Sequence, residues 1–340
     1  MKVLGIETSC DETAAAVVCD DKNPEKRIIS NVIASQIDIH KKYGGVVPNI
    51  AARCHVDVID KVVKEALENA NCSIHDIDVI AATACPGLIG GLIVGTVFAK
   101  TMSIMAQKPY IAIDHLEGHL LTCRMCYDID FPFLGIITSG GNFMFIEALD
   151  VGKYNVLGQT LDDAAGECFD KVSKMLGLGY PGGKVIQEKA KLGDENRFQF
   201  TIPMQHRAGC DVSFSGLKTA VKTCIASLGK LSEQDICDVA ASFQNTVVTF
   251  VIKQLGKAYK KLSIIPKGLV VCGGVAANLK LRNALKIYAT SHSTELFTAP
   301  LDLCGDNGAM IAWTAIERIN HNFPFSGLDY APSPRSSIFV

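Results

Sequence analysis

Short apolar runs separated by polar turns predict strands in two widely separated parts of the chain. Residues 3–6 and 14–18 are apolar and flank a polar turn, which is a strand–turn–strand pattern. The same pattern returns at residues 133–138 and 143–146, around a turn of Ser, Gly, Gly and Asn. A further strand is predicted at residues 268–271, and helical spacing of apolar residues follows it. Strands that alternate with helices in two similar halves predict the α/β class.

A short polar and aromatic connection at residues 126–132 separates the two halves. We expect an N-terminal lobe over residues 1–126 and a C-terminal lobe over residues 127–314, with residues from about 315 to 340 returning to the first lobe. Residues 323–340 carry prolines and serines without a period, which predicts a loosely packed tail. The two matched turns indicate a clamp on phosphates, because backbone N–H groups of such turns can approach an anion closely, although ordinary β-turns have the same sequence pattern. A cleft between two lobes is the default position for a ligand.

The composition narrows the class of protein. The chain has 340 residues, enough for about two domains, and its 48% hydrophobic and 20% charged residues exclude intrinsic disorder. A formal net charge of −2 excludes a generally basic nucleic-acid binder, so an RNA contact must come from a local patch or a partner. Thirteen cysteines, an odd number, and an N-terminus without a signal-peptide pattern predict reduced thiols and a cytoplasmic location.

One uncharged stretch, residues 79–99, is long enough to cross a bilayer. It contains Pro86, Gly87 and further glycines, and it lacks aromatic belts and flanking basic residues. We therefore expect a buried strand over residues 79–84, a Pro-Gly turn and a buried helix over residues 88–105, with no membrane as a partner.

Two histidines, His115 and His119, stand four residues apart. In a helix this spacing places both imidazoles on one face, within reach of a single metal ion, although two histidines that form hydrogen bonds within a partly buried helix have the same spacing. Glu117 lies about 200° around the helix from His115, so it points away from such a metal, unlike the glutamate of a zincin protease. The spacing leaves the third ligand open between the CxxC of Cys123 and Cys126 and the distant Asp306.

Basic residues gather in one segment. Residues 239–294 contain no Asp or Glu but several lysines, which gives a local positive field suited to phosphates or an RNA backbone. A solvated helix face whose acidic partners come from elsewhere in the chain has the same composition.

Eight short motifs give the chain a specific family resemblance. They occur in the order GIETSCDET (residues 5–13), YGGVVP (43–48), HLEGH (115–119), DDAAGE (162–167), YPGG (180–183), FSGLKT (214–219), GGV (273–275) and DNGAM (306–310). The chain resembles the bacterial tRNA adenosine threonylcarbamoyltransferase family, formerly called the O-sialoglycoprotein endopeptidase family, over about residues 1–320.

The resemblance implies a fold, a reaction and partners. The fold is a two-lobed actin/Hsp70/sugar-kinase-like (ASKHA) α/β fold with a nucleotide cleft between the lobes. The reaction moves the threonylcarbamoyl group from threonylcarbamoyl-AMP to the adenosine 3′ of the anticodon in tRNAs that read codons starting with A. The implied partners are tRNA, a shorter paralogous subunit of the same fold and a small P-loop ATPase subunit.

The resemblance also implies the site residues. One divalent metal ion per subunit, iron in first place and zinc as the alternative, is bound by His115, His119 and Asp306, which favours the carboxylate over the CxxC. No catalytic acid, base or nucleophile is assigned. Threonylcarbamoyl-AMP or an adenine nucleotide contacts Ile137, Thr138, Ser139, Gly140, Gly141, Asp170, Gly183 and Asn278.

Three residues depart from the family pattern. Asn142 and Phe143 stand where bacterial relatives commonly carry His-Thr, and Gln187 stands where many carry an acid. We expect altered ligand contacts at these positions rather than loss of activity.

Two other functions compete with the transferase. An ATP-dependent phosphotransferase of the same fold would use the paired turns but would leave the two histidines unexplained. A metalloprotease conflicts with the position of Glu117.

Overall fold

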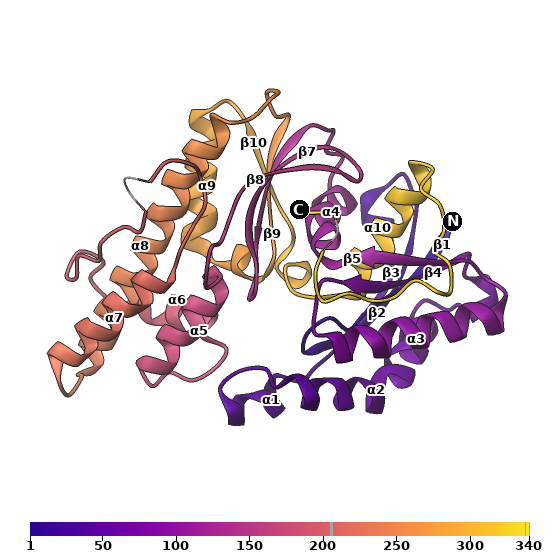
Figure 1. Cartoon of the computed structure of the whole chain (residues 1–340), viewed down its shortest axis with the longest axis horizontal. Helices are drawn as coiled ribbons and strands as arrows, with labels where there is room; N and C mark the ends of the chain where they lie inside the picture. The colour runs from indigo at the N-terminus through magenta and orange to yellow at the C-terminus, as the bar shows by residue number, and fades with distance from the viewer. Residues whose placement is uncertain (205–206, 337, 340) are drawn as a thin grey trace. The chain divides into compact units, whose positions relative to one another are not determined.

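A computed structural model describes residues 1–204, 207–336 and 338–339 of the chain. The chain forms two compact units, each built on a five-stranded sheet with helices (Figure 1). Unit 1 comprises Met1–Ile129, Asp150–Tyr154 and Ala299–Val340, and unit 2 comprises Asp130–Leu149 and Asn155–Thr298. The predicted α/β class is confirmed.

The sheet of unit 1 has the order β3-β2-β1-β4-β5. Its strands are β1 (Lys2–Glu7), β2 (Glu12–Cys19), β3 (Ile28–Ser35), β4 (Val79–Cys85) and β5 (Tyr110–Asp114). Strand β2 pairs antiparallel with β1 on one side and with β3 on the other. On the opposite side of β1, β4 pairs parallel with β1, and β5 pairs parallel with β4. The predicted hairpin at residues 3–18 is therefore the start of this sheet.

Helices cover both faces of this sheet. They are α1 (Ile37–His40), α2 (Pro48–Asn69), α3 (Ile89–Ala106), α4 (His115–Cys126) and α10 (Gly308–Asn320). Leu4 and Ile6 of β1 pack in one core with residues of α2. Gly5 lies between them in the strand and faces the other side, where α10 packs.

The sheet of unit 2 repeats this topology, with the order β10-β9-β6-β7-β8. Its strands are β6 (Phe133–Thr138), β7 (Phe143–Asp150), β8 (Lys153–Gln159), β9 (Gly268–Cys272) and β10 (Glu295–Thr298). In both sheets the first strand is central, with an antiparallel neighbour on one side and a parallel neighbour on the other. The internal similarity that the two hairpins predict extends to the whole sheet.

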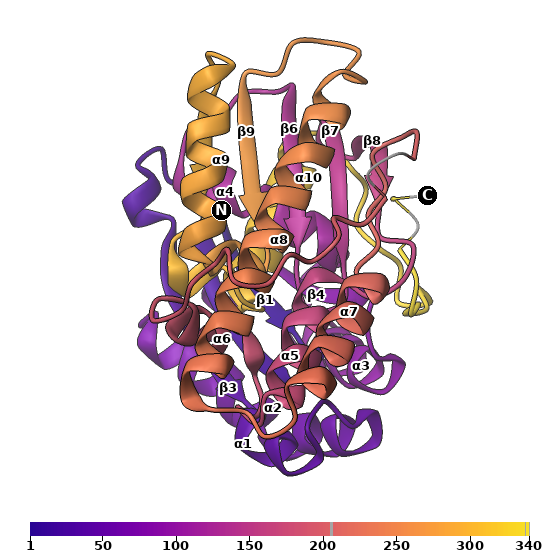
Figure 2. The ribbon, with the colours of Figure 1, turned by 90° about the vertical axis from the view of Figure 1, so that its left-hand side faces the viewer.

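In the sequence, the helices of unit 2 lie between its strands: among the described residues, four lie between β8 and β9, and α9 lies between β9 and β10 (Figure 2). They are α5 (Ala165–Met175), α6 (Gly182–Ala190), α7 (Ser215–Leu228), α8 (Glu233–Tyr259) and α9 (Leu279–Ser291). Helix α6 packs on α5 and α8, and α8 also contacts α9.

The uncharged stretch forms the strand β4, the Pro-Gly turn and the helix α3 where the sequence predicts them, but the expectation of a buried helix holds for only a third of α3. Helix α3 is long and apolar enough to cross a membrane by length and composition, and 33% of its 18-residue window is buried. A core helix of a protein without membrane spans passes the same test.

The described residues of the C-terminal tail are mostly exposed and form no helix or strand, which agrees with the expectation of a loosely packed tail, but hydrogen bonds hold the tail along unit 1 at several points. The Ser326 N–H donates to Tyr110 O and the Ser333 N–H to Ala84 O, each at 2.9 Å. The Ser336 hydroxyl donates to Asp114 Oδ2 at 2.5 Å. Hydrogen bonds to the ends of β4 and β5, rather than a helix or strand of its own, fix this segment.

Candidate functional site

The first histidine of the predicted metal pair begins helix α4. Strand β5 ends at Asp114, whose Oδ1 accepts hydrogen bonds from Leu116 N–H at 2.8 Å and Glu117 N–H at 3.2 Å. This N-cap satisfies two of the first N–H groups and starts the helix at His115. His119 follows one turn later, on the same face.

The third residue reaches the pair because α10 packs directly against strands β1 and β2. A Cβ atom on Gly5 would lie 2.4 Å from Gly308 O, and a Cβ atom on Gly308 would lie 2.5 Å from Ala16 N. Only glycine allows this approach of helix to sheet at either position. It places Asp306, two residues before the start of α10, beside α4.

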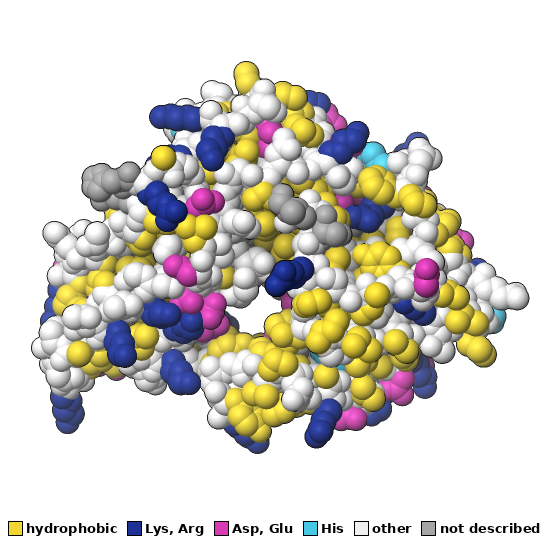
Figure 3. All heavy atoms as spheres, in the orientation of Figure 1, with side chains coloured by type: hydrophobic (Ala, Val, Ile, Leu, Met, Phe, Trp, Pro, Cys, Tyr) yellow, Lys and Arg dark blue, Asp and Glu magenta, His cyan; other side chains and the backbone are white. Residues whose placement is uncertain are grey.

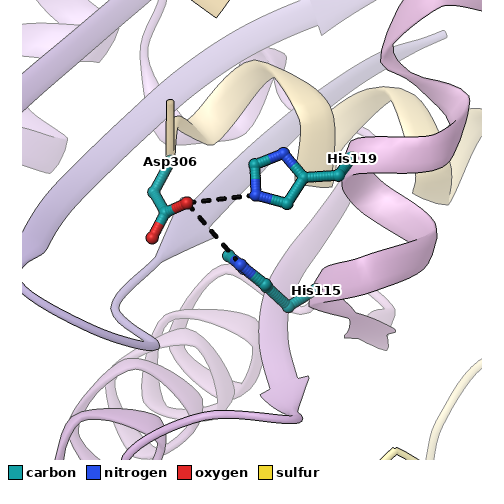
Figure 4. A group of neighbouring side chains, drawn as sticks. All are labelled: His115, His119 and Asp306. Carbon is teal, nitrogen blue, oxygen red and sulfur yellow. Dashed lines mark hydrogen bonds and ion pairs between the residues drawn. The ribbon is translucent and has the colours of Figure 1, made fainter. Parts of the chain in front are cut away.

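The two imidazoles and the carboxylate converge on one point (Figure 4). His119 Nε2 lies 3.1 Å and His115 Nε2 lies 3.6 Å from Asp306 Oδ1. One ligand atom from each residue lies within 4.8 Å of the others, and this cluster includes neither Cys123 nor Cys126. Two histidines and one carboxylate that leave coordination positions open form a donor set that fits iron or zinc.

The charges in this cluster stabilise one another. Burial by itself would lower the pKa of His115, but the carboxylates of Asp306 and Glu7 outweigh it and raise that pKa to about 9. Burial likewise opposes ionisation of Asp306, but the neighbouring histidines hold its pKa at about 2. The site therefore concentrates negative charge around two imidazoles, which is a setting that favours a cation.

A buried carboxylate that our sequence analysis did not assign, Glu7, orients His115. Glu7 Oε2 lies 3.0 Å from His115 Nδ1 and accepts a hydrogen bond from the Thr83 hydroxyl at 2.5 Å. Glu7 Oε1 accepts from the Ser9 N–H at 2.5 Å. A carboxylate on Nδ1 keeps the proton there and leaves Nε2 able to bind a metal. Its position at the end of β1, in the motif GIETSCDET, is the only sequence signal for this role.

Glu117 is turned away from the cluster, as predicted. It is fully buried and accepts hydrogen bonds from the Tyr154 hydroxyl at 2.9 Å and Arg318 Nε at 2.6 Å. Burial raises the pKa of Glu117, while Arg318 opposes this effect. Glu117 thus joins α4 to α10 and is not placed to act as the base of a protease.

In unit 2, the turn between β6 and β7 carries five of the predicted ligand residues. Ile137 and Thr138 end β6, and the Ser139 N–H donates to Asn142 O at 2.9 Å across the turn. The N-terminus of α5 supports the turn, because Gly166 N–H donates to Ser139 O and Glu167 N–H to Gly140 O, at 3.2 and 3.1 Å.

The exposed side of this turn is open to a ligand. A Cβ atom on Gly140 or Gly141 would meet nothing within 4 Å. Over the described part of the chain, the N–H groups of these two glycines have no acceptor, and Thr138 Oγ1 is buried without a hydrogen-bond partner. Because the Ser139 N–H is used within the turn, the N–H groups of the two glycines are the ones that can bind an anion.

Of the other predicted ligand residues, Gly183 and Asn278 lie at helix starts of unit 2, and Asp170 lies in the middle of α5. Asp170 Oδ1 accepts from the Gly182 N–H at 2.6 Å, and Gly183, the next residue of α6, is exposed with open space around it. Asn278 caps α9, because its Oδ1 accepts from Leu281 N–H at 3.0 Å. Its amide also donates to Gln244 Oε1 at 2.8 Å, which fixes the orientation of the side chain.

The turn between β9 and α9 lies beside the turn between β6 and β7. Gly273 has φ of 90°, and a Cβ atom there would lie 2.5 Å from Thr138 O. The structure therefore brings the predicted Gly273 turn and the residues at the end of β6 together.

Two of the departing residues have structural roles. Phe143 is buried and contacts Phe145 and Phe214 ring to ring, so its side chain belongs to the core of unit 2. Gln187 Oε1 accepts from the Leu279 N–H at 2.7 Å and joins α6 to the start of α9.

The sequence and the fold both match known proteins. The family described as TsaD, tRNA N6-adenosine threonylcarbamoyltransferase, matches residues 27–313. This chain belongs to that family. A tRNA N6-adenosine threonylcarbamoyltransferase from Brucella anthropi is 48% identical over 340 residues, covering 98% of this chain and 94% of that protein. One from Brucella canis matches with the same identity and coverage.

Solved structures with low identity share the fold of this TsaD-family chain. HypF in its phosphate- and nucleotide-bound form has a TM-score of 0.61 at 14% identity, covering 95% of this chain and 47% of that one. The (R)-2-hydroxyglutaryl-CoA dehydratase component A of Acidaminococcus fermentans has a TM-score of 0.53 at 16% identity, covering 92% and 96%. With the two sheets of equal topology, these neighbours confirm the predicted ASKHA fold class.

Proposed function

We propose that this chain transfers the threonylcarbamoyl group from threonylcarbamoyl-AMP to N6 of the adenosine 3′ of the anticodon in tRNAs that read codons starting with A. Membership of the TsaD family over nearly the whole chain carries this proposal. The cluster of His115, His119 and Asp306 supports it, because a metal-assisted transfer needs a centre with open coordination positions.

The donor makes few demands on the protein. It is a mixed carbamic–phosphoric anhydride, so its carbonyl carbon is already activated. The adenosine amine forms a C–N bond to this carbon, the C–O bond to the phosphate breaks, AMP leaves with the electron pair and one amine proton is released. The chain must bind and orient both substrates, and no nucleophile or general base is assigned to it.

Each group of residues has a separate task. One divalent metal per subunit, iron or else zinc, held by His115, His119 and Asp306, supplies Lewis-acid polarisation of an oxygen when bound. The N–H groups of Gly140 and Gly141 donate to an oxygen of the carbamoyl or phosphate group. Gly183, at the start of α6, offers a further N–H group and the positive end of a helix dipole.

The remaining contacts define the nucleoside end of the donor. Gly274, whose Cα faces open space, lets the backbone approach the adenine or ribose. Asn278, fixed by Gln244, presents its remaining amide hydrogen, and Asp170 holds the start of α6 in place.

Mass spectrometry of tRNA nucleosides tests this function. Unmodified tRNA is incubated with the chain, its partner subunits, threonine, bicarbonate, ATP and the donor-forming enzyme. We expect threonylcarbamoyladenosine to form only when the chain is present. Phosphorylated small molecules without modified adenosine would show the phosphotransferase instead, and cleavage of a glycoprotein that is lost in Glu117→Gln would show a protease.

We also propose that the chain works in the cytoplasm with a shorter paralogous subunit of the same fold and a small P-loop ATPase. Helix α3 exposes three apolar side chains at four-residue spacing, Ile89, Ile93 and Val97, with exposed fractions of 45%, 47% and 56%. A face of this kind fits a protein partner better than water. Ile93→Asp should abolish the complex with the paralogous subunit in size-exclusion chromatography; an unchanged complex would place the partner elsewhere.

A further inference from the structure

The C-terminal turns of α8 and α9 form a basic end of unit 2 that the proposed transfer reaction does not use. The two helices contact each other, and the ring of Tyr259 on α8 lies 6.3 Å from Tyr288 and 5.1 Å from His292 at the end of α9. Tyr288 and His292 stack at 4.0 Å. We call this region the lysine–tyrosine surface; it comprises Lys253, Lys257, Lys260, Lys261, Tyr259, Tyr288 and His292.

The lysines of this surface lack acidic partners. Among the described residues, none of the four forms an ion pair with a carboxylate. Several other lysines of unit 2 do so, as Lys171 and Lys218 do with Asp163 and as Lys280 does with Glu195. The sequence also allowed a solvated helix face whose lysines pair with acidic residues from elsewhere in the chain. These four lysines do not form such pairs among the described residues.

Two carboxylates of unit 2, Glu147 and Asp130, are already engaged, whereas the exposed Glu295 follows His292 by three residues. Glu147 is buried and accepts from the Ser263 N–H and hydroxyl at 2.5 and 2.7 Å, and Asp130 pairs with Lys267. The C-terminus of a helix carries only about half a negative charge, so the ends of α8 and α9 cannot neutralise four lysines. In Figure 3, dark-blue side chains lie over the part of unit 2 where Figure 1 draws the ends of these two helices.

Two of the lysines are held in place while two remain extended into solvent. Lys257 Nζ donates to Arg207 O at 3.0 Å, and Lys261 Nζ donates to Leu157 O at 3.1 Å. Lys253 lies on α8, and Lys260 is the residue that follows the helix. The two are seven residues apart, so they are exposed on the same face. Exposed cations beside stacked rings are the combination that RNA-binding surfaces use.

We propose that the lysine–tyrosine surface binds the phosphate backbone of the tRNA at a distance from the reacting adenosine. This inference rests on the proposed function, because it takes tRNA as the substrate. Helix α9 starts at the Asn278 turn and ends at this surface, and its 13 residues span about 20 Å. Contacts so far from the turn stabilise the bound tRNA equally before and during transfer, so they affect KM rather than kcat.

The test compares two double variants in the complete complex. Lys253→Gln with Lys260→Gln removes the two extended cations of the surface. Lys222→Gln with Lys230→Gln removes two exposed lysines of unit 2 outside it, which also lack ion pairs among the described residues. Binding of fluorescent unmodified tRNA is measured against salt concentration, and threonylcarbamoyl transfer is measured as kcat and KM.

The surface variant should bind tRNA more weakly, with a salt slope reduced by about 2. Counterion release from two phosphate contacts strengthens tRNA binding about 60-fold at 0.1 M salt relative to 1 M salt. Loss of both contacts should therefore raise KM by at most about this factor. The control variant should behave as wild type, and kcat should be unchanged in both.

Equal tRNA affinity and equal salt slope in the two variants would overturn the inference, and would leave an acidic protein as the partner to test on this surface. Failure of the proposed function is a separate result. In that case the wild-type complex itself forms no threonylcarbamoyladenosine, whereas failure of this inference leaves transfer intact and the two variants alike.

Discussion

Replacing Glu7 with glutamine should weaken metal binding although no metal ligand is removed. Glu7→Gln keeps the shape of the buried side chain, so its Oε1 can still accept from the Ser9 N–H, which donates to Glu7 at 2.5 Å. The other Glu7 oxygen, 3.0 Å from His115 Nδ1, then becomes an NH₂ group. An NH₂ group at this position donates to Nδ1 and moves the imidazole proton to Nε2, which faces Asp306.

The magnitude follows from the role of a carboxylate behind a metal-binding histidine. Loss of such a partner costs about 10- to 100-fold in metal affinity. This range corresponds to about 1.4–2.8 kcal/mol of binding free energy. The Thr83 hydroxyl, which donates to Glu7 at 2.5 Å, can rotate and accept instead, so the fold should survive the change.

Competition with a chelator of known affinity measures this effect for zinc and ferrous iron, and circular dichroism with thermal unfolding reports the fold. Ser9→Ala is the matched control, because it removes the Ser9 hydroxyl 3.1 Å from His115 Nδ1 but keeps the Ser9 N–H. We expect a smaller loss for Ser9→Ala than for Glu7→Gln. Metal affinity in Glu7→Gln equal to wild type would refute the reasoning that Glu7 sets the imidazole tautomer.

Two further predictions concern packing and charge. Gly5→Ala places a Cβ atom 2.4 Å from Gly308 O. It should lower the free energy of unfolding in urea by about 1–3 kcal/mol and should also lower metal affinity. Wild-type values for both quantities would show that α10 can shift freely. Asp163→Asn should cost about 1–3 kcal/mol at pH 7, because the ion pairs of Asp163 with Lys218 and Lys171 outweigh burial and hold its pKa below the ordinary value. A carboxyl group whose pKa is lower in the folded chain than in the unfolded chain stabilises the fold at pH values above the unfolded pKa. The difference in unfolding free energy between wild type and Asp163→Asn should therefore shrink as the pH falls below about 4. A difference that persists at lower pH would contradict this origin.

Local sequence patterns predicted much of the fold because the strands are short, apolar and separated by distinctive turns. The hairpins at β1–β2 and β6–β7 and the strand–turn–helix of β4 and α3 follow from residues that are neighbours in sequence. The tail could not be predicted in this way. Its order comes from serines that bond to Tyr110, Ala84 and Asp114, and such long-range hydrogen bonds leave no period in the sequence.

The cluster of His115, His119 and Asp306 shows the same limit. The four-residue spacing predicted that His115 and His119 share a face, but spacing could not choose Asp306 over a cysteine pair. That choice depends on two glycines about 300 residues apart in sequence, Gly5 and Gly308, which let α10 approach the sheet. The role of Glu7 could not be inferred either. Its place in the motif GIETSCDET singles it out, but nothing in the sequence connects this carboxylate with a histidine 108 residues away.

We propose that His115, His119 and Asp306 bind one metal ion on which transfer depends. The most direct test measures bound metal by elemental mass spectrometry, and threonylcarbamoyladenosine formation in the same samples, for wild type and for folded His119→Ala reconstituted with iron or zinc. We expect one metal ion per wild-type chain, and neither bound metal nor transfer in His119→Ala. Full transfer by His119→Ala without metal, or one tightly bound ion in that variant, would contradict this proposal.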